Sequence, residues 1–242
     1  MRKPEVFKAI FFDAGGTLFS PFPSVGEIYA QASFRFGTVC DPSVLEAEFH
    51  AAWQRRGGLS SLGPQSNEAK EKAWWHSLVE EVFRPYGGVQ DFEDFFEGLY
   101  HSFEQRELWA IYPEVSGVLS FFRGKGYVLG IVSNWDSRLP RLVRNLQIAH
   151  YFDFILGSSA CGATKPSRKI FEAALARSQT QPGETVHVGD NFEEDFLGAR
   201  QVGITPFLLE RDGPGNAPAD LSPEARVRSL IQLKERLEHL NG

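Results

Sequence analysis

Apolar positions along the chain follow two different periods, and these divide the chain into two kinds of region. Residues 6–12 form a short apolar run that contains a single lysine, and the glycine pair Gly15 and Gly16 follows it. This pattern predicts a buried strand. Between Pro21 and Trp109 the apolar positions recur at helical spacing, and no strand pattern interrupts them. We expect helices in that region over residues 24–36, 43–56, 67–83 and 92–104.

Two of these helices begin with a capping signal. Ser24 is followed three positions later by Glu27, and Ser43 is followed in the same way by Glu46. In this pattern the two side chains accept hydrogen bonds from backbone N–H groups that have no partner in the first helical turn. Both apolar runs end at glycine, which favours the end of a helix.

After Trp109 the helix and strand patterns alternate. Strands are expected over residues 127–132, 154–156, 185–188 and 206–209, and helices over residues 113–123, 138–146, 168–176 and 193–201. The Gly/Pro-rich stretch 211–220 is expected to be a loop, and residues 222–240 an amphipathic helix or a short strand and a helix. Alternation of this kind predicts a parallel sheet with helices on its faces.

The order of the elements predicts the fold class and a division into two domains. We expect an α/β protein with a Rossmann-like, doubly wound parallel sheet and an inserted all-helical cap domain. Residues 1–19 and 111–242 would form the core domain, and residues 20–110 the cap. The segments 19–23 and 110–113 would connect the two and act as hinges.

Composition and charge indicate which kinds of molecule the protein is expected to bind. The chain has 242 residues, of which 42% are hydrophobic, and this is enough to bury a sizeable core. Its formal net charge is −6, which disfavours binding to nucleic acid or to an anionic membrane surface. A small-molecule substrate is therefore the expected partner.

The cysteines and the N-terminal residues indicate a cytoplasmic protein. Cys40 and Cys161 lie far apart and form no CxxC pair, which suits a reducing compartment and offers no zinc site. The stretch MRKPEVFKAIFFDAGG has basic residues but no long apolar run before Asp13, so it does not resemble a secretory leader. No apolar run approaches the length of a membrane span.

Polar residues collect where the expected parallel strands end, which is where a sheet of this kind binds its ligand. These residues are Asp13, Ser133, Asn134, Gly189 and Asp190, with Lys165 in the loop after the third strand and Asp195 one turn beyond the fourth. Three carboxylates, a lysine and a hydroxyl at one crevice indicate a site for a hard cation and an anionic substrate.

Four short motifs in this order resemble those of the haloacid dehalogenase superfamily. They are FDAGGTLF, IVSN, TKP and HVGDNFEED, and together they are specific although each alone would be weak. The resemblance spans almost the whole chain, with the helical block in the place of that family's C1-type cap. Within the superfamily the chain is most similar to the branch called haloacid dehalogenase-like hydrolase domain-containing protein 3.

The resemblance implies a phosphatase that forms an aspartyl-phosphate. It makes Asp13 the nucleophile and assigns Mg²⁺ to Asp13, Asp190 and the backbone carbonyl of Gly15, with Asp195 behind them or bound through water. Lys165 would offset the remaining negative charge and orient the nucleophile, and Ser133 would bind phosphoryl oxygens. Asn134 completes the expected catalytic set, and the expected substrate is a small phosphorylated metabolite.

One position departs from the phosphatases of this family. Two residues after the nucleophile they carry a second aspartate, which acts as general acid and base, whereas this chain has Gly15. General acid–base assistance typically contributes about 10²- to 10⁴-fold, so its loss should slow the reaction without removing the nucleophile or the metal. We therefore expect a slow phosphatase, or one that acts on leaving groups that need no proton.

Three alternatives stay open. Ser133 and Asn134 would suit a metal-free 2-haloacid dehalogenase, although Gly189 and Asp190 do not fit that branch and no convincing cap arginine is found. A phosphonatase also has a small residue two positions after the nucleophile, but it needs a cap lysine that forms a Schiff base. The candidates are Lys70 and Lys72, which lie in a polar stretch. The third alternative is a protein that binds a ligand or partner with negligible turnover.

Several further residues are expected to be structural rather than functional. His187 alternates with apolar residues in an expected strand and shows no metal-ligand spacing with other histidines. Trp135 would either contact substrate or pack beneath the cap. The cap aromatic residues recur at helical spacing, which is more typical of a core than of a substrate site; they include Trp53, Trp74, Phe95, Phe96 and Phe103.

Overall fold

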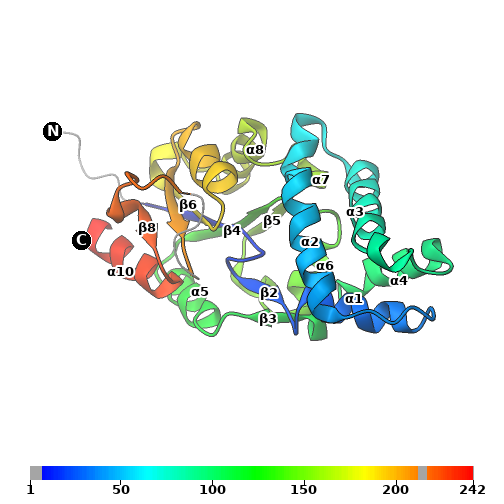
Figure 1. Cartoon of the computed structure of the whole chain (residues 1–242). Coiled ribbons are helices and arrows are strands. Elements are labelled where there is room, and N and C mark those ends of the chain that lie inside the picture. Colours follow the sequence, from blue (N-terminus) through cyan, green and yellow to red (C-terminus); the bar gives the residue numbers. More distant parts are fainter. Residues whose placement is uncertain (1–6, 212–216, 242) are drawn as a thin grey trace.

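The computed structural model describes residues 7–211 and 217–241, and its centre is a parallel sheet (Figure 1). The strands lie in the order β5-β4-β1-β6-β7-β8, and every neighbouring pair is parallel. Their bounds are β1 (Ala9–Phe12), β4 (Val128–Ser133), β5 (Phe154–Gly157), β6 (Thr185–Gly189), β7 (Thr205–Leu209) and β8 (Arg226–Val227). This confirms the predicted α/β class with a Rossmann-like sheet.

Strand β1 is apolar at every position because both faces of the sheet are covered. Successive side chains of a strand point to opposite faces. Ile10 and Phe12 belong to one buried cluster with residues of α5, α6 and α10, whereas Ala9 and Phe11 belong to a second cluster with residues of α8 and α9. A strand buried on both sides reads as a continuous hydrophobic run, which explains the sequence pattern.

The helices that cover the sheet follow its strands along the chain. They are α5 (Val115–Gly124), α6 (Leu139–Asn145), α7 (Ser158–Cys161), α8 (Arg168–Ser178), α9 (Gly198–Arg200) and α10 (Leu230–Asn241), with a π-helical turn over Phe192–Leu197. Short 3₁₀ helices lie at Leu59–Gln65, Arg84–Tyr86, Arg106–Leu108, Ala149–Tyr151, Pro182–Glu184 and Pro223–Ala225. No helix of the described residues is both long and apolar enough to cross a membrane.

Four helices form a separate body beside the sheet, and we call them the cap helices (Figure 1). They are α1 (Val25–Phe34), α2 (Pro42–Arg56), α3 (Glu68–Val82) and α4 (Phe92–Ser102). Their buried side chains make a hydrophobic cluster of their own, in which the rings of Phe83 and Phe95 lie 5.1 Å apart.

The chain enters and leaves the cap helices through two short strands that pair with each other. Strand β2 (Phe19–Pro21) and strand β3 (Trp109–Ile111) are antiparallel, with Phe19 opposite Ile111. The segments predicted as connections therefore contain a hydrogen-bonded ribbon. Its strands have only three residues each, which is too short for a strand pattern to be recognised in the sequence.

The order and type of the longer predicted elements are confirmed, and the ends of some differ. Ser24 caps α1 as predicted, because its side chain accepts from the Glu27 N–H at 3.2 Å. The predicted cap at Ser43 is wrong. Asp41 caps α2 by accepting from the Ser43 N–H at 2.8 Å, and Pro42 lies in the first turn, where its missing N–H costs nothing.

Differences in the second half of the chain have local causes. The helix predicted over residues 193–201 is divided into the π-helical turn and α9, and the short helix α7 was not predicted because four residues carry no periodicity. Residues 222–240 contain a short strand and a helix, which was one of the two predicted outcomes. Residue 6 of the first predicted strand and residues 212–216 of the predicted loop lie outside the described residues.

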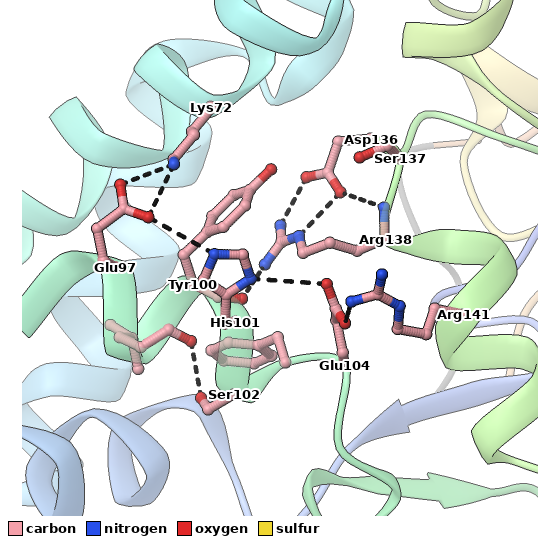
Figure 2. A network of polar contacts seen from close by, with 12 residues as sticks. Lys72, Glu97, Tyr100, His101, Ser102, Glu104, Asp136, Ser137, Arg138 and Arg141 are labelled. Atoms are coloured by element: carbon pink, nitrogen blue, oxygen red, sulfur yellow. Dashed lines mark hydrogen bonds and ion pairs between the residues drawn. The ribbon is translucent and has the colours of Figure 1, made fainter.

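Polar contacts join the cap helices to the loop after β4 (Figure 2). The Arg138 guanidinium donates to the Asp136 carboxylate at 2.6 and 2.8 Å and to the Tyr100 carbonyl at 2.5 Å, and it lies over the Tyr100 ring. Arg141 of α6 pairs with Glu104 at 2.6 Å. These contacts hold α4 against the sheet.

A second contact runs through α3. Glu68 accepts from the N–H and hydroxyl of Ser137 at 2.9 and 2.8 Å. Glu71 is fully buried and accepts from the Ser158 hydroxyl at 2.6 Å and from the Ser66 hydroxyl. Burial raises the pKa of the Glu71 carboxyl to about 7.

Candidate active site

The ends of β1, β4 and β6 meet at one edge of the sheet, which we call the carboxyl edge. Phe12 pairs with Ile131 of β4 and with Val188 of β6, so the residues that follow in each strand lie side by side. Asp13 is the next residue of β1, and its N–H donates to the Val188 carbonyl at 2.9 Å. The parallel register therefore brings Asp13 between Ser133 and the turn that contains Asp190.

Lys165 reaches the same edge and joins two carboxylates. Its Nζ lies 2.5 Å from Asp13 Oδ1 and 2.5 Å from Asp195 Oδ1, and its side chain is 1% exposed. The side chain of Asn134 fixes the backbone of Lys165 from both sides, since Oδ1 accepts from the Lys165 N–H at 2.6 Å and Nδ2 donates to its carbonyl at 3.0 Å. Asn134 is thus a positioning residue for the lysine.

Asp195 turns back from the π-helical turn onto β6. Its Oδ1 lies 2.8 Å from His187 Nε2, and its Oδ2 accepts from the Asn191 N–H at 3.1 Å. A Cβ at Gly189 would overlap this carboxylate, so only glycine fits there. Irregular turns of the π type are frequent at functional sites because they redirect a side chain in this way.

Three acidic side chains crowd together at the carboxyl edge. Oxygen atoms of Asp13, Asp190 and Asp195 all lie within 4.8 Å of one another, and the Lys165 ammonium contacts two of these residues. Burial, followed by the neighbouring acids Asp13 and Asp195, raises the pKa of Asp190 well above its usual value. The charged form of Asp190 is therefore disfavoured in the protein alone, and a bound cation would favour it.

The pKa shifts of the other groups follow from the same geometry. Burial raises the pKa of Asp13 more than Lys165 lowers it. Burial also acts on Asp195, but Lys165 and His187 outweigh it and hold the pKa of Asp195 below its usual value. The pKa of Lys165 is raised, because Asp13 and Asp195 outweigh the burial of its ammonium. Lys165 and Asp195 thus favour each other's charged forms.

The donor set fits a small divalent cation. Carboxylate and carbonyl oxygens are the ligands that Mg²⁺ prefers, and Asp13, Asp190 and Asp195 supply carboxylates around one point. Gly16 has a φ of +75°, and a Cβ there would overlap the Asp190 carboxylate. Gly16 thus lets the loop after the nucleophile approach Asp190 closely.

Gly15 lies beneath an aromatic ring. A Cβ at this position would stand 3.3 Å from Cζ3 of Trp135, which is tighter than an ordinary carbon contact. Trp135 in turn packs edge to face against Phe19, with ring centroids 5.8 Å apart. The space that a side chain at position 15 would enter is therefore bounded by this tryptophan.

The predicted site residues are close to one another in the structure. Asp13, Asp190, Asp195 and Lys165 make direct contacts or share one cluster. Ser133 is buried at the end of β4, and hydrogen bonding by its side chain lowers the pKa of Asp13 against the larger effect of burial.

Sequence reasoning missed two residues of this network. His187 was expected to be a purely structural strand residue, yet it orients Asp195. Glu194 accepts from Asn134 Nδ2 at 2.7 Å, and burial raises the pKa of its carboxyl to about 7. A signal for His187 was present, because it lies two positions before Gly189 and therefore on the same face of β6.

The structure thus combines a parallel sheet flanked by helices with an acid–lysine cluster where its first strand ends. The chain belongs to the haloacid dehalogenase-like hydrolases, whose family model matches residues 7–203.

Among curated relatives, two are informative. Haloacid dehalogenase-like hydrolase domain-containing protein 3 of Danio rerio is 31% identical over 242 residues and covers 99% of this chain and 99% of its own length. Phosphoserine phosphatase of Thermus thermophilus is 30% identical over 197 residues, which are 79% of this chain and 75% of that protein.

Two solved structures bear names of different reactions. A HAD phosphatase from Thermococcus onnurineus is 25% identical with a TM-score of 0.65, and covers 96% of this chain and 98% of its own. A 2-haloacid dehalogenase from Pseudomonas syringae is 26% identical with a TM-score of 0.64, and covers 96% and 99%. Membership of the family therefore does not by itself identify the bond that is cleaved.

Proposed function

We propose that the protein is a Mg²⁺-dependent phosphatase that acts on a small phosphorylated molecule through an aspartyl-phosphate on Asp13. The observation that carries this proposal is the buried Lys165, held between Asp13 and Asp195 in a cluster of three carboxylates. A haloacid dehalogenase needs no cation, whereas three acids beside one ammonium favour a site that binds one. The phosphatases among the similar proteins support the same choice.

The residues divide the chemistry between them. An Asp13 oxygen attacks phosphorus, the bond from phosphorus to the leaving oxygen breaks, and water later hydrolyses the aspartyl-phosphate to release phosphate and restore Asp13. Lys165 holds the attacking carboxylate in place, and Ser133 binds a phosphoryl oxygen. A Mg²⁺ ion held by Asp13, Asp190, the Gly15 carbonyl and, through water, Asp195 would neutralise the phosphoryl charge.

Because position 15 is glycine, the rate of turnover should depend on the basicity of the leaving group. No carboxylic acid stands at this position to protonate the leaving oxygen, so that oxygen must depart as an anion or take its proton from water. We expect turnover to favour acyl phosphates and p-nitrophenyl phosphate over alkyl phosphates such as sugar phosphates. Values of kcat/KM that do not vary with the basicity of the leaving group would contradict this.

The environment of the cap lysines argues against phosphonate cleavage. Lys70 Nζ donates to the Gln65 carbonyl at 2.8 Å, and Lys72 pairs with Glu97 at 2.7 Å. A Schiff-base lysine is activated by desolvation or by a neighbouring cation, whereas Lys70 is exposed and Lys72 lies beside a carboxylate. Neither lysine has the environment of a nucleophile.

Two further parts of the proposal concern organisation and location. We propose that residues 20–110 are a cap domain and that residues 1–19 and 111–242 are the catalytic domain, which the separate hydrophobic cluster of the cap helices supports. The cap would open to admit substrate and close to exclude water.

We also propose a cytoplasmic location. Cys40 and Cys161 are both free thiols, which supports it.

The test is hydrolysis of p-nitrophenyl phosphate by the wild-type protein with Mg²⁺ and with EDTA. Activity that depends on the metal and disappears in a folded Asp13→Asn variant is the expected result. If the wild-type protein binds Mg²⁺ by calorimetry but releases no phosphate, Gly15 has disabled the reaction and the proposal fails.

A further inference from the structure

An apolar cavity of about 140 Å³ lies inside the cap helices and extends to the loop after β4, and we call it the cap cavity. Each of the four cap helices contributes an aromatic ring to its wall: Tyr29 from α1, Trp53 from α2, Trp75 from α3 and Phe96 from α4. Two of these rings, Trp53 and Phe96, were among the aromatic residues expected from their spacing to belong to a core. The four rings form a core that encloses a space.

The cap cavity adjoins the proposed catalytic loop. Asn134 and Trp135, which directly follow Ser133, belong to its wall. The Trp135 ring also lies against Gly15, so one side chain borders both the cavity and the loop of the nucleophile. A substrate whose phosphoryl group meets Asp13 therefore has this cavity beside its leaving group.

Aromatic and aliphatic side chains make up most of the wall of the cavity. Arg138 also lies in the wall, but Asp136 and the Tyr100 carbonyl satisfy its guanidinium, which stacks on the Tyr100 ring 3.5 Å from the centroid (Figure 2). The cavity therefore offers a ligand apolar contacts rather than a free charge.

We infer that the cap cavity binds the leaving group of the substrate, and that this group is apolar and contains one ring. This inference rests on the proposed phosphatase function. Apolar cavities of roughly 150 Å³ hold benzene, so the volume suits a six-membered ring. The hydroxyl groups of a sugar would lose their hydrogen bonds to water there without replacement, which excludes sugar phosphates as good substrates.

The first experiment compares benzyl phosphate with glycerol 1-phosphate on the wild-type protein. Both esters have an alkyl leaving oxygen, so a difference reports on the ring rather than on an activated leaving group. Burial of one ring should raise kcat/KM for benzyl phosphate at least about tenfold. Equal values of kcat/KM would overturn the inference.

A filled cavity should remove that preference. Val79 lies in the wall and is 2% exposed, so Val79→Phe places a ring in the space and should return the ratio of the two kcat/KM values to about one. Val44→Phe makes the same change on a surface position of α2 that is 40% exposed, and should keep the wild-type ratio.

A binding measurement separates this inference from the phosphatase proposal. Calorimetry with benzylphosphonate and methylphosphonate needs no turnover, and the benzyl compound should bind the Mg²⁺-loaded wild-type protein at least about tenfold more tightly. Tighter binding without hydrolysis of any ester would overturn the phosphatase proposal and keep the cavity. Hydrolysis of acetyl phosphate together with equal affinity for the two phosphonates would overturn the cavity and keep the phosphatase.

Discussion

The two sides of Trp135 differ in almost every physical respect. On one side the carboxyl edge gathers Asp13, Lys165 and Asp195 around short charge-assisted contacts. On the other, aromatic rings make up much of the wall of the cap cavity. Under the proposed function, the first would activate the phosphoryl group and the second would discriminate between esters. Reaction and selectivity would then be supplied by separate parts of the chain, so that each could be changed without the other.

Asp13→Asn is the substitution with the largest expected effect, and it separates the two sides most sharply. Turnover should fall at least about 10³-fold, because the amide cannot attack phosphorus. Affinity for benzylphosphonate should change far less, since the ring-binding surface is untouched. Steady-state kinetics and calorimetry on the same preparation measure both, with circular dichroism as the control for folding. A parallel loss of binding would mean that the two sides are one site.

Lys165→Met should damage both the reaction and the fold. The substitution leaves the buried carboxylates of Asp13 and Asp195 without their counter-ion. Removal of one partner of a buried ion pair typically costs about 3–5 kcal/mol, so the free energy of unfolding should fall by that order. Urea denaturation measures it, and Lys169→Met on the exposed side of α8 is the control. An unchanged stability would show that the acids are protonated in the folded protein.

Glu71→Gln tests how the cap helices are held against the sheet. The folded protein keeps the Glu71 proton up to about pH 7, whereas the unfolded chain releases it near 4.5, so this group lowers the free energy of unfolding as pH rises through that window. The difference between wild type and variant should change by about 3 kcal/mol across it. Thermal or urea unfolding at several pH values measures the difference. Glu80→Gln, on the exposed side of α3, should show no such trend.

Gly15→Asp has the smallest expected effect, and it changes the residue that lies against Trp135, between the carboxyl edge and the cap cavity. An acid at this position should assist alkyl leaving groups, but its side chain must displace the Trp135 ring. We expect little gain on glycerol 1-phosphate from Gly15→Asp alone, and about tenfold when Trp135→Phe makes room. Trp135→Phe alone is the control. No gain from the folded double variant would indicate that another group already acts as the acid.

The carboxyl edge could be predicted because its residues stand next to strand ends. Apolar runs mark strands, parallel strands end at one edge, and Asp13 and Asp190 interrupt those runs at that edge. His187 and Glu194 escaped prediction because their roles depend on the π-helical turn that folds Asp195 back over Gly189. No periodicity in the sequence indicates such a turn.

The cap cavity could not be predicted for a different reason. Tyr29, Trp53, Trp75 and Phe96 each have the spacing of an ordinary core residue on their own helix. Whether such rings fill the centre of a bundle or surround a space depends on how four helices pack, which is a sum of small shape effects. The N-terminus of α2 was mispredicted for another reason: Ser43 with Glu46 matches a capping pattern, whereas the side chain that caps the helix is that of Asp41, two residues earlier.

The ribbon of β2 and β3 has a consequence for the history of such a chain. Phe19 of β2 and Ile111 of β3 are paired, so the chain enters the cap helices and returns from them at the same place. A short turn could join the two strands in place of the cap helices without altering the path of any strand in the sheet. Different helical inserts can therefore be exchanged at this point by recombination, and one catalytic scaffold can acquire new substrates by replacing a single block of sequence.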